Sequence, residues 1–407
     1  MNGVLDSRWP PCVVLGLETQ IGLCVVRELG RAGVSVIGIA QEEDAIGLCS
    51  RYLTTGMVVG EARSEALLQA IRAIGERFGP CPLLAISEAN LDWLSRHRES
   101  LGQVTPVVPE AAALRIVLDK QSTLDVAREV GIDTPVSIQP QPGWQMDDLV
   151  SRCRLPVVLK WSDPNAVVRE LESHGLPLLK AEYVHTRADL QVALSRYSAI
   201  GQWPLVQEYC AGYGLGQFFF MHQGQALRRF QHRRVAEWPP EGGFSSVCDA
   251  VPLTEHVDLQ ERSIALLRAI GWEGVAMVEY RYDPLRCAAR LMEINGRFWG
   301  SFPLAYHAGA GFALLCYRQA AGLPLAELDV APRSDLRCRM VATELKRLSR
   351  IVLRPGLIAD PCFRIRPWQE VWRFVQDFFR PTVRYYVWSL NDPRPFFADL
   401  RNLLRNA

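Results

Sequence analysis

The sequence predicts an α/β protein, and three patterns support this fold class. Apolar segments of strand length alternate with helical patterns through the first 110 residues, as expected for a parallel sheet. Strand-like segments at 217–221 and 226–230 flank a turn, which indicates an antiparallel hairpin. Two further segments, at 278–282 and 291–297, carry charged or polar side chains at alternate positions.

The composition is that of a globular chain without a dominant charge. Of 407 residues, 49% are hydrophobic and 22% are charged, and domains of about 150 residues would give two to four domains. The net charge of +1 provides no field that would attract nucleic acid. Eleven cysteines occur without a Cys-x-x-Cys pair, and neither a signal-peptide pattern nor a membrane-length apolar run is visible. We therefore expect a cytoplasmic protein with reduced thiols.

Residues 1–110 predict a small Rossmann-like domain. A strand at 12–16, a helix at 21–32 and a strand at 34–39 form a βαβ unit. Further elements are predicted at 63–78 (helix), 81–86 (strand) and 88–96 (helix). The turn after the first strand is not G-x-G-x-x-G, and the acids at 42–44 are weak evidence for a ribose contact. We expect a scaffold here rather than a dinucleotide site.

Two lysines are candidates for phosphate binding in the middle of the chain. Pro106 and Pro109 mark a boundary, after which residues 111–131 are predicted to be helical and include Lys120. A strand-like segment then ends at Lys160. A lysine that closes an apolar, β-branched strand places a desolvated cation at the end of a sheet, where it could neutralise phosphates.

The most informative residues lie near the end of the predicted core. Alternation along an extended chain directs Glu293, Asn295 and Arg297 to one side. If Tyr282 pairs with Arg290, the register places Glu279 opposite Glu293. Carboxylates this close repel one another unless a cation lies between them, and oxygen ligands suit Mg²⁺. The alternative is a hairpin with its charged side chains in solvent.

The order Glu279, then Glu293-x-Asn295-x-Arg297, resembles the metal-binding end of the ATP-grasp superfamily, as found in carboxylate–amine ligases and the large subunit of carbamoyl-phosphate synthase. The resemblance covers residues 12–325. It implies a Rossmann-like domain before an ATP-grasp domain, whose two subdomains hold ATP and Mg²⁺, or Mn²⁺, between them. Glu279, Glu293 and Asn295 would bind the metal, and Arg297 would steady a transferred phosphoryl group or an acyl-phosphate.

The same resemblance assigns the nucleotide contacts. Lys120 and Lys160 would reach the phosphates. A short apolar strand at 205–210 that leads into a Gly-rich turn at 211–216 resembles the hinge that meets adenine, because glycines let the main chain approach a flat ring. Glu208 would contact the adenine amino group, while Tyr209 and Cys210 would contribute backbone groups.

Two features of the family pattern are missing. Residues 161–179 contain only Gly175 where the family has a Gly-rich loop over the phosphates. Either another loop covers the nucleotide, or the lid is disordered without ligand; Lys180 could substitute as a phosphate ligand, although it also fits an ordinary surface lysine. The acidic residue that usually contacts the ribose, a few positions after Cys210, is not visible.

A basic patch precedes a Gly-Gly loop. The patch consists of Arg228, Arg229, His232, Arg233 and Arg234. Because arginine binds carboxylates and phosphates through paired hydrogen bonds, Arg233 and Arg234 could receive an acidic substrate or the γ-phosphate. The resemblance places the acceptor near Gly243, Ser245 and Ser246. A strand with solvated charges explains the patch equally well.

Residues 331–407 are predicted to be a partly helical, basic and aromatic extension. Aromatic and apolar side chains recur at helical spacing in this region: Trp368, Val371, Trp372, Val375, Phe378 and Phe379. Such a stripe favours packing against the ATP-grasp domain, assigned to 111–330, over contact with a membrane surface or a partner.

The sequence therefore predicts an ATP-dependent ligase that joins a carboxylate to an amine through an acyl-phosphate and releases ADP and phosphate. Its partners would be small-molecule or peptide carboxylates and amines, with homo-oligomerisation left open. Alternatives are a phosphotransferase or carboxylase on the same scaffold and a non-catalytic nucleotide-binding subunit. A Rossmann oxidoreductase is the weakest alternative.

Overall fold

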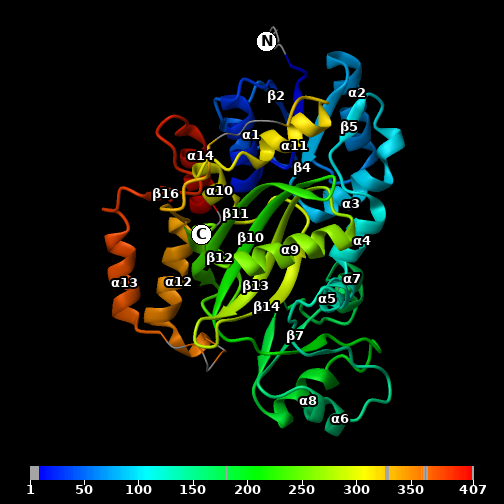
Figure 1. Cartoon of the computed structure of the whole chain (residues 1–407), viewed down its shortest axis with the longest axis vertical. Coiled ribbons are helices and arrows are strands. Elements are labelled where there is room, and N and C mark those ends of the chain that lie inside the picture. The colour runs from blue at the N-terminus through cyan, green and yellow to red at the C-terminus, as the bar shows by residue number, and fades with distance from the viewer. Residues whose placement is uncertain are drawn as a thin grey trace.

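The computed structural model describes residues 9–162, 164–179, 181–325, 330–358, 360, 363 and 365–405. Within these residues the chain forms three β-sheets. Figure 1 shows the N-terminal sheet at the top of the molecule, a central sheet in the middle and a small sheet at the bottom. Lys180 lies outside the described residues.

The N-terminal sheet is parallel, with the order β3-β2-β1-β4-β5. Its strands are β1 (Cys12–Leu15), β2 (Val36–Ala40), β3 (Thr55–Val58), β4 (Cys81–Ala85) and β5 (Val104–Pro106). Its helices are α1 (Gln20–Arg31), η1 (Ile46–Cys49), α2 (Glu65–Phe78), α3 (Glu88–Arg96) and η2 (Arg98–Ser100). Ser64 and Ser87 cap α2 and α3, because each hydroxyl accepts a hydrogen bond from a backbone N–H of the first turn. The strand order confirms the Rossmann-like prediction.

The small sheet is antiparallel, with the order β6-β9-β7-β8. Its strands are β6 (Ser137–Ile138), β7 (Val157–Lys160), β8 (Glu182–Val184) and β9 (Leu205–Glu208). Its helices are α6 (Met146–Arg152), α7 (Pro164–Ser173) and α8 (Arg187–Ser195), and it is preceded by α4 (Ala111–Leu118) and α5 (Lys120–Glu129). Asp119 separates α4 from α5 by capping α5, since its carboxylate accepts a hydrogen bond from the backbone N–H of Ser122. Helix α7 occupies much of the segment where a Gly-rich loop would lie.

The central sheet has the order β14-β13-β10-β11-β12-β15-β16. Its strands are β10 (Tyr213–His222), β11 (Gln225–Trp238), β12 (Phe244–Ala250), β13 (Gly274–Asp283), β14 (Ala288–Asn295), β15 (Arg337–Arg339) and β16 (Val383–Tyr385). Helix α9 (Val257–Ile270) packs with α4 and α5 against one face of this sheet, around buried side chains such as Leu215 and Tyr280. The other face continues into the N-terminal core through α10 (Phe302–His307) and α11 (Phe312–Ala320).

The C-terminal residues complete the central sheet instead of forming a separate appendage. Strand β15 pairs with β12, and β16 pairs with β15. The remaining elements are α12 (Val341–Leu353), η3 (Pro355–Leu357), α13 (Pro367–Gln376) and α14 (Arg394–Arg405). Asp392 reaches back to the N-terminal domain, where its carboxylate accepts hydrogen bonds from Arg27 Nε at 3.0 Å and from Ser50 Oγ at 2.7 Å.

The prediction that the aromatic stripe of α13 packs against the core is wrong. The side chains of Trp368 and Phe379 are 83% and 81% exposed, and Trp372 is 63% exposed. Periodicity shows which side chains share one side of a helix, but not which side faces inward. None of the described helices has the length and apolar composition needed to cross a bilayer.

Candidate active site

Two carboxylates face each other on the central sheet. Strands β13 and β14 are antiparallel, and Glu279 lies directly opposite Glu293. Asn295 Nδ2 donates a hydrogen bond of 3.2 Å to Glu293 Oε1. The sequence therefore predicted correctly that these carboxylates and this amide come together.

The register that produces this pairing differs from the predicted one near the turn. Tyr282 pairs with Ala289, not with Arg290, so the hairpin starts one residue out of the expected register. A β-bulge between Glu279 and Tyr280 adds one residue to β14 and restores the expected pairing of Glu279 with Glu293. The bulge therefore sets the direction of both carboxylates.

Basic side chains surround the two carboxylates. Lys120 Nζ lies 3.8 Å from Glu293 Oε2, and an Arg234 guanidinium nitrogen lies 2.5 Å from Glu279 Oε2. Burial raises the pKa of Glu279 and outweighs the attraction of Arg234. Removal from water would also raise the pKa of Glu293, but the charges of Lys120 and Lys160 outweigh this effect and hold that pKa below its usual value.

Lys160 closes β7, as the sequence predicted, and its ammonium donates a hydrogen bond of 3.4 Å to Gln207 Oε1 on the neighbouring strand β9. Desolvation lowers the pKa of Lys160, and repulsion from Lys120 lowers it further, while the two carboxylates oppose the shift. The small sheet and the central sheet thus bring two lysines to the same pair of carboxylates.

Arg234 reaches Glu279 by crossing over β10. Its side chain passes over Gly214, where an added Cβ would lie 2.6 Å from Arg234 Cδ. At Gly216, which lies between His232 and Glu279 in register, a Cβ would lie 2.7 Å from His232 Nε2. The sequence analysis predicted that these glycines expose backbone to adenine. They lie inside a strand, where the missing side chains leave room for Arg234 and His232.

Two further charged residues extend this network and were missed by the sequence analysis. Glu237 pairs with Arg234 at 3.0 Å and with Arg281 at 3.4 Å. Arg234 also donates to the carbonyl oxygen of Gly243 at 2.9 Å. Alternation along β13 places Arg281 on the same side as Glu279, which is the signal that could have identified it.

The hinge residues lie at the end of β9 and are held by protein contacts. Glu208 Oε2 pairs with Arg290 Nη1 at 2.5 Å, which outweighs the desolvation of the carboxyl group and lowers its pKa. The backbone N–H of Tyr209 donates to the carbonyl oxygen of Pro156 at 3.2 Å, so this N–H cannot also serve a ligand. The carbonyl oxygen of Cys210 accepts a hydrogen bond of 3.4 Å from Arg281 Nε.

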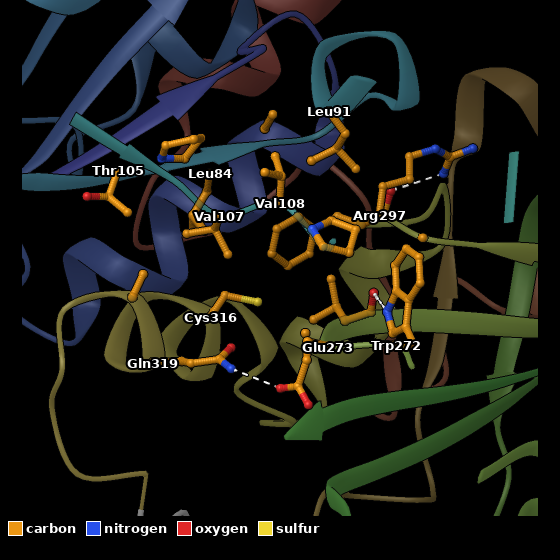
Figure 2. Close-up of a pocket in the computed structure, with 18 residues that line it drawn as sticks. Leu84, Leu91, Thr105, Val107, Val108, Trp272, Glu273, Arg297, Cys316 and Gln319 are labelled. Carbon is orange, nitrogen blue, oxygen red and sulfur yellow. Dashed lines mark hydrogen bonds between the residues drawn. The ribbon is translucent and has the colours of Figure 1, made fainter. Parts of the chain in front are cut away.

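Arg297 lies beyond the end of β14 and faces the N-terminal domain. Its guanidinium pairs at 3.3 Å with Glu88, the first residue of α3. It also lies at the rim of a cavity of about 200 Å³ between the N-terminal and central sheets. Figure 2 shows Leu91 and Val107 on one side of this cavity and Trp272 on another. Glu88 follows a parallel strand at its carboxyl end, where ligand-binding residues commonly lie, and this position could have identified it.

The candidate acceptor residues lie around β11 and β12. Arg233 pairs with Asp249 at 3.2 Å, and Ser245 Oγ donates to the carbonyl oxygen of Val247 at 3.1 Å. Ser246 is fully buried, and its hydroxyl has no hydrogen-bond partner among the described residues. The structure thus divides the basic patch between the two faces of β11, with only Arg234 in contact with the paired carboxylates.

Comparison with solved structures identifies the architecture. Neither a protein-family model nor a curated protein matches the sequence. An L-amino acid ligase from Bacillus licheniformis has 17% identity and a TM-score of 0.56, over 77% of this chain and 75% of that chain. Biotin carboxylase from Campylobacter jejuni, in a β,γ-ATP complex, has 15% identity and a TM-score of 0.60, over 80% and 74%. N5-carboxyaminoimidazole ribonucleotide synthetase from Thermus thermophilus has 15% identity and a TM-score of 0.60, over 80% and 82%.

The fold is ATP-grasp. At these identities the likeness shows the fold alone, and it confirms the predicted fold class. The ATP-grasp fold implies a magnesium ion beside nucleotide phosphates, and the residues present fit one. Mg²⁺ in such sites uses one or two carboxylates, with phosphates and waters as its other ligands. Glu279, Glu293 and the Asn295 amide oxygen supply such a set, although no group of three His, Cys, Asp or Glu suited to a metal occurs in the described chain.

Proposed function

We propose that the protein is an ATP-dependent ligase that joins a carboxylate to an amine through an acyl-phosphate. The observation that carries this proposal is the opposition of Glu279 and Glu293 with Lys120, Lys160 and Arg234 around them. Carboxylates and cationic side chains this close to one another suit a polyphosphate and its divalent cation, because each charge on the ligand finds an opposite charge on the protein.

Each residue of the site then has a specific role. Glu279, Glu293 and Asn295 would hold Mg²⁺, or Mn²⁺, which would supply positive charge to the phosphates. Lys120 and Lys160 neutralise phosphate oxygens as the substrate carboxylate attacks the γ-phosphorus in line. The bond to the β-phosphate oxygen breaks and ADP leaves; the amine then attacks the acyl-phosphate carbon, and phosphate leaves.

The nucleotide base would lie at the end of β9. Glu208 would accept a hydrogen bond from the adenine amino group, provided that it exchanges its contact with Arg290. Tyr209 and Cys210 would contribute backbone groups, but the Tyr209 N–H already donates to Pro156. The Tyr209 N–H is therefore not available to adenine, whereas the Glu208 carboxylate and the Cys210 backbone stay predicted contacts.

Arg297 would hold the acyl-phosphate or the attacking carboxylate. In the structure Glu88 occupies its guanidinium, so a substrate carboxylate would take the place of the Glu88 carboxylate. The cavity at this residue would accept the non-reacting part of the substrate. Arg233, Gly243, Ser245 and Ser246 stay candidates for the acceptor side. A cytoplasmic location agrees with the need for ATP.

Thermal stability with and without MgATP tests the proposal at its centre. Nucleotide at a hundred times its Kd should add about 2.7 kcal/mol to the free energy of unfolding. Glu293→Ala should abolish this increase because it removes a metal ligand. Glu261→Ala is the matched control, since Glu261 pairs with Arg229 on the opposite face of the same sheet. It should retain the full increase.

Turnover distinguishes the reaction class. We expect ADP release that depends on both an acid and an amine, with the new amide detected by mass spectrometry. Release that requires bicarbonate, or that yields no amide, would assign a carboxylase or a phosphotransferase instead. Nucleotide binding without turnover on any acid and amine would assign a non-catalytic subunit. No MgATP response in the wild type would refute the proposed site.

A further inference from the structure

Helix α13 has its apolar side outward. Trp368, Trp372 and Val375 recur at intervals of four and three residues, so they share one side of the helix, and Phe379 follows in the turn after it. All four side chains are solvent-exposed, with exposed fractions from 42% to 83%. Figure 1 shows α13 at the outer left of the molecule, with α12 between it and the central sheet. These four side chains form the α13 face.

The opposite side of α13 is polar and is held by ion pairs. Glu370 pairs with Arg347 of α12, and Asp377, just after the helix, pairs with Arg337 of β15 at 3.0 Å. The Arg339 guanidinium lies 4.6 Å from the centre of the Phe374 ring. Turning the helix to bury its aromatic side would break these buried contacts, which are costly to lose. The outward direction of the α13 face is therefore built into the fold.

Charges along residues 341–380 are also sorted by sign. From 341 to 380, the described acidic residues are turned inward: the Glu344, Glu370 and Asp377 side chains are only 5%, 11% and 0% exposed, and Asp360 is 2% exposed. The basic side chains that are exposed over the same stretch are Lys346, Arg354, Arg366 and Arg380; Arg380 also pairs with Asp377 at 3.1 Å and keeps 47% of its side chain exposed. The outer surface of α12 and α13 thus presents cations and aromatic rings without an exposed carboxylate among its described residues.

We propose that the α13 face and these four cations bind the surface of an anionic lipid bilayer. Tryptophan and phenylalanine insert into the headgroup layer, where an apolar ring meets water at one edge. Each lysine or arginine near the surface adds electrostatic attraction to anionic headgroups. With ten residues, α13 is too short to span a bilayer and would lie along it. The cytoplasmic leaflet carries anionic lipid, so the proposed ligase could work there.

Vesicle co-sedimentation of the full chain tests this inference. We expect binding to phosphatidylcholine vesicles that contain phosphatidylglycerol, weaker binding at high salt, and little binding to pure phosphatidylcholine. The double variant Trp368→Ala/Trp372→Ala should lower the partition coefficient by about tenfold or more. Arg354→Glu/Arg366→Glu should lower it by a similar factor and only for the anionic vesicles. Melting temperatures should stay near that of the wild type, because all four side chains are exposed.

The matched control is Val192→Ala/Leu285→Ala, which removes two apolar side chains that are 65% and 95% exposed elsewhere on the surface. This control should bind vesicles like the wild type. Equal loss in the control and in the tryptophan variant would overturn the proposal, as would no wild-type binding to anionic vesicles at low salt. The proposal would also be overturned if light scattering shows a dimer of the wild type, a monomer of the tryptophan variant, and no vesicle binding by either. The α13 face would then be assigned to contact with a second copy of the chain.

Discussion

Arg27 and Arg234 each bury a guanidinium against a carboxylate, but their surroundings differ. Arg27 and Asp392 have side-chain exposures of 0% and 1%, and the Asp392 carboxylate is completed by Ser50 and by the backbone N–H of Arg51. Arg234 and its partner Glu279 keep exposures of 14% and 11%. Beside Glu279 lies a second carboxylate, that of Glu293, whose side chain is 36% exposed.

This difference separates a structural ion pair from a candidate site. The Arg27 cluster joins segments more than 300 residues apart, and its carboxylate has its partners within the folded chain. The Glu279 cluster places like charges next to each other, so that part of its stability depends on which cations are present. A ligand cation could replace Arg234 or Lys120, whereas nothing from solvent can replace Arg27.

The largest expected effect concerns the Arg27 cluster. Asp392→Ala leaves the buried Arg27 guanidinium without its partner and should lower the free energy of unfolding by about 3–5 kcal/mol. Denaturant unfolding measures this loss. Asp335→Ala, which breaks an exposed pair with Arg333, should change little. If Asp392→Ala and Asp335→Ala lower the free energy of unfolding by the same amount, the buried Arg27 cluster contributes no more to stability than an exposed pair.

A smaller effect is expected where Arg234 and His232 cross β10. Gly216→Ala adds a Cβ that would meet the rigid His232 ring, and overpacking of this kind should cost about 1–3 kcal/mol. The variant should also respond less to MgATP, because Glu279 lies beside Gly216 in register. At Gly60 a Cβ has its nearest neighbour at 4.0 Å, so Gly60→Ala should leave both measurements unchanged. If Gly216→Ala has the stability and the MgATP response of the wild type, this position on β10 tolerates a side chain.

The smallest effect concerns Glu28, a carboxylate to which the described residues supply no cationic partner. Glu28 accepts a hydrogen bond from the Leu314 backbone N–H, and desolvation raises its pKa from 4.5 to about 7. A folded-state pKa above the unfolded value favours the protonated form, so this contribution to stability is lost as pH rises from 4.5 through 7. Glu28→Gln should therefore gain on the order of 1–2 kcal/mol over the wild type at neutral pH. Urea unfolding of both proteins at neutral pH and at pH 4.5 measures this gain in the free energy of unfolding. The gain should vanish at pH 4.5.

Local patterns were enough to predict an α/β fold class and the paired carboxylates, whereas the ATP-grasp fold was predicted from the family resemblance. Alternation in β13 and β14 identifies Glu279 and Glu293, and they oppose each other because the bulge compensates for the one-residue error in the predicted register at the turn. The bulge was missed because β14 was treated as one continuous alternation, although Leu291 and Ile294, three residues apart, both pack in the core beside α9. It changed the pairing at the turn without changing the outcome at the site.

Residues supplied by distant segments could not be predicted from local patterns. Glu88 meets Arg297 from the N-terminal domain, and Arg234 reaches Glu279 only because β10 lies between their strands and carries a glycine at the crossing. The direction of the α13 face likewise depends on Arg347 and Arg337, which belong to other elements. Periodicity describes one segment, whereas these contacts depend on which segments become neighbours.

The pairing of β15 with β12 makes the C-terminal residues the protective border of the central sheet. Without them, Val247, Cys248 and Asp249 would form an unprotected edge strand with unpaired N–H and C=O groups. Such an edge can recruit a strand from another molecule, which leads to aggregation or strand exchange. A recombinant fragment that ends at residue 330, the predicted end of the ATP-grasp domain, would therefore be expected to precipitate, even with every residue of the candidate site present.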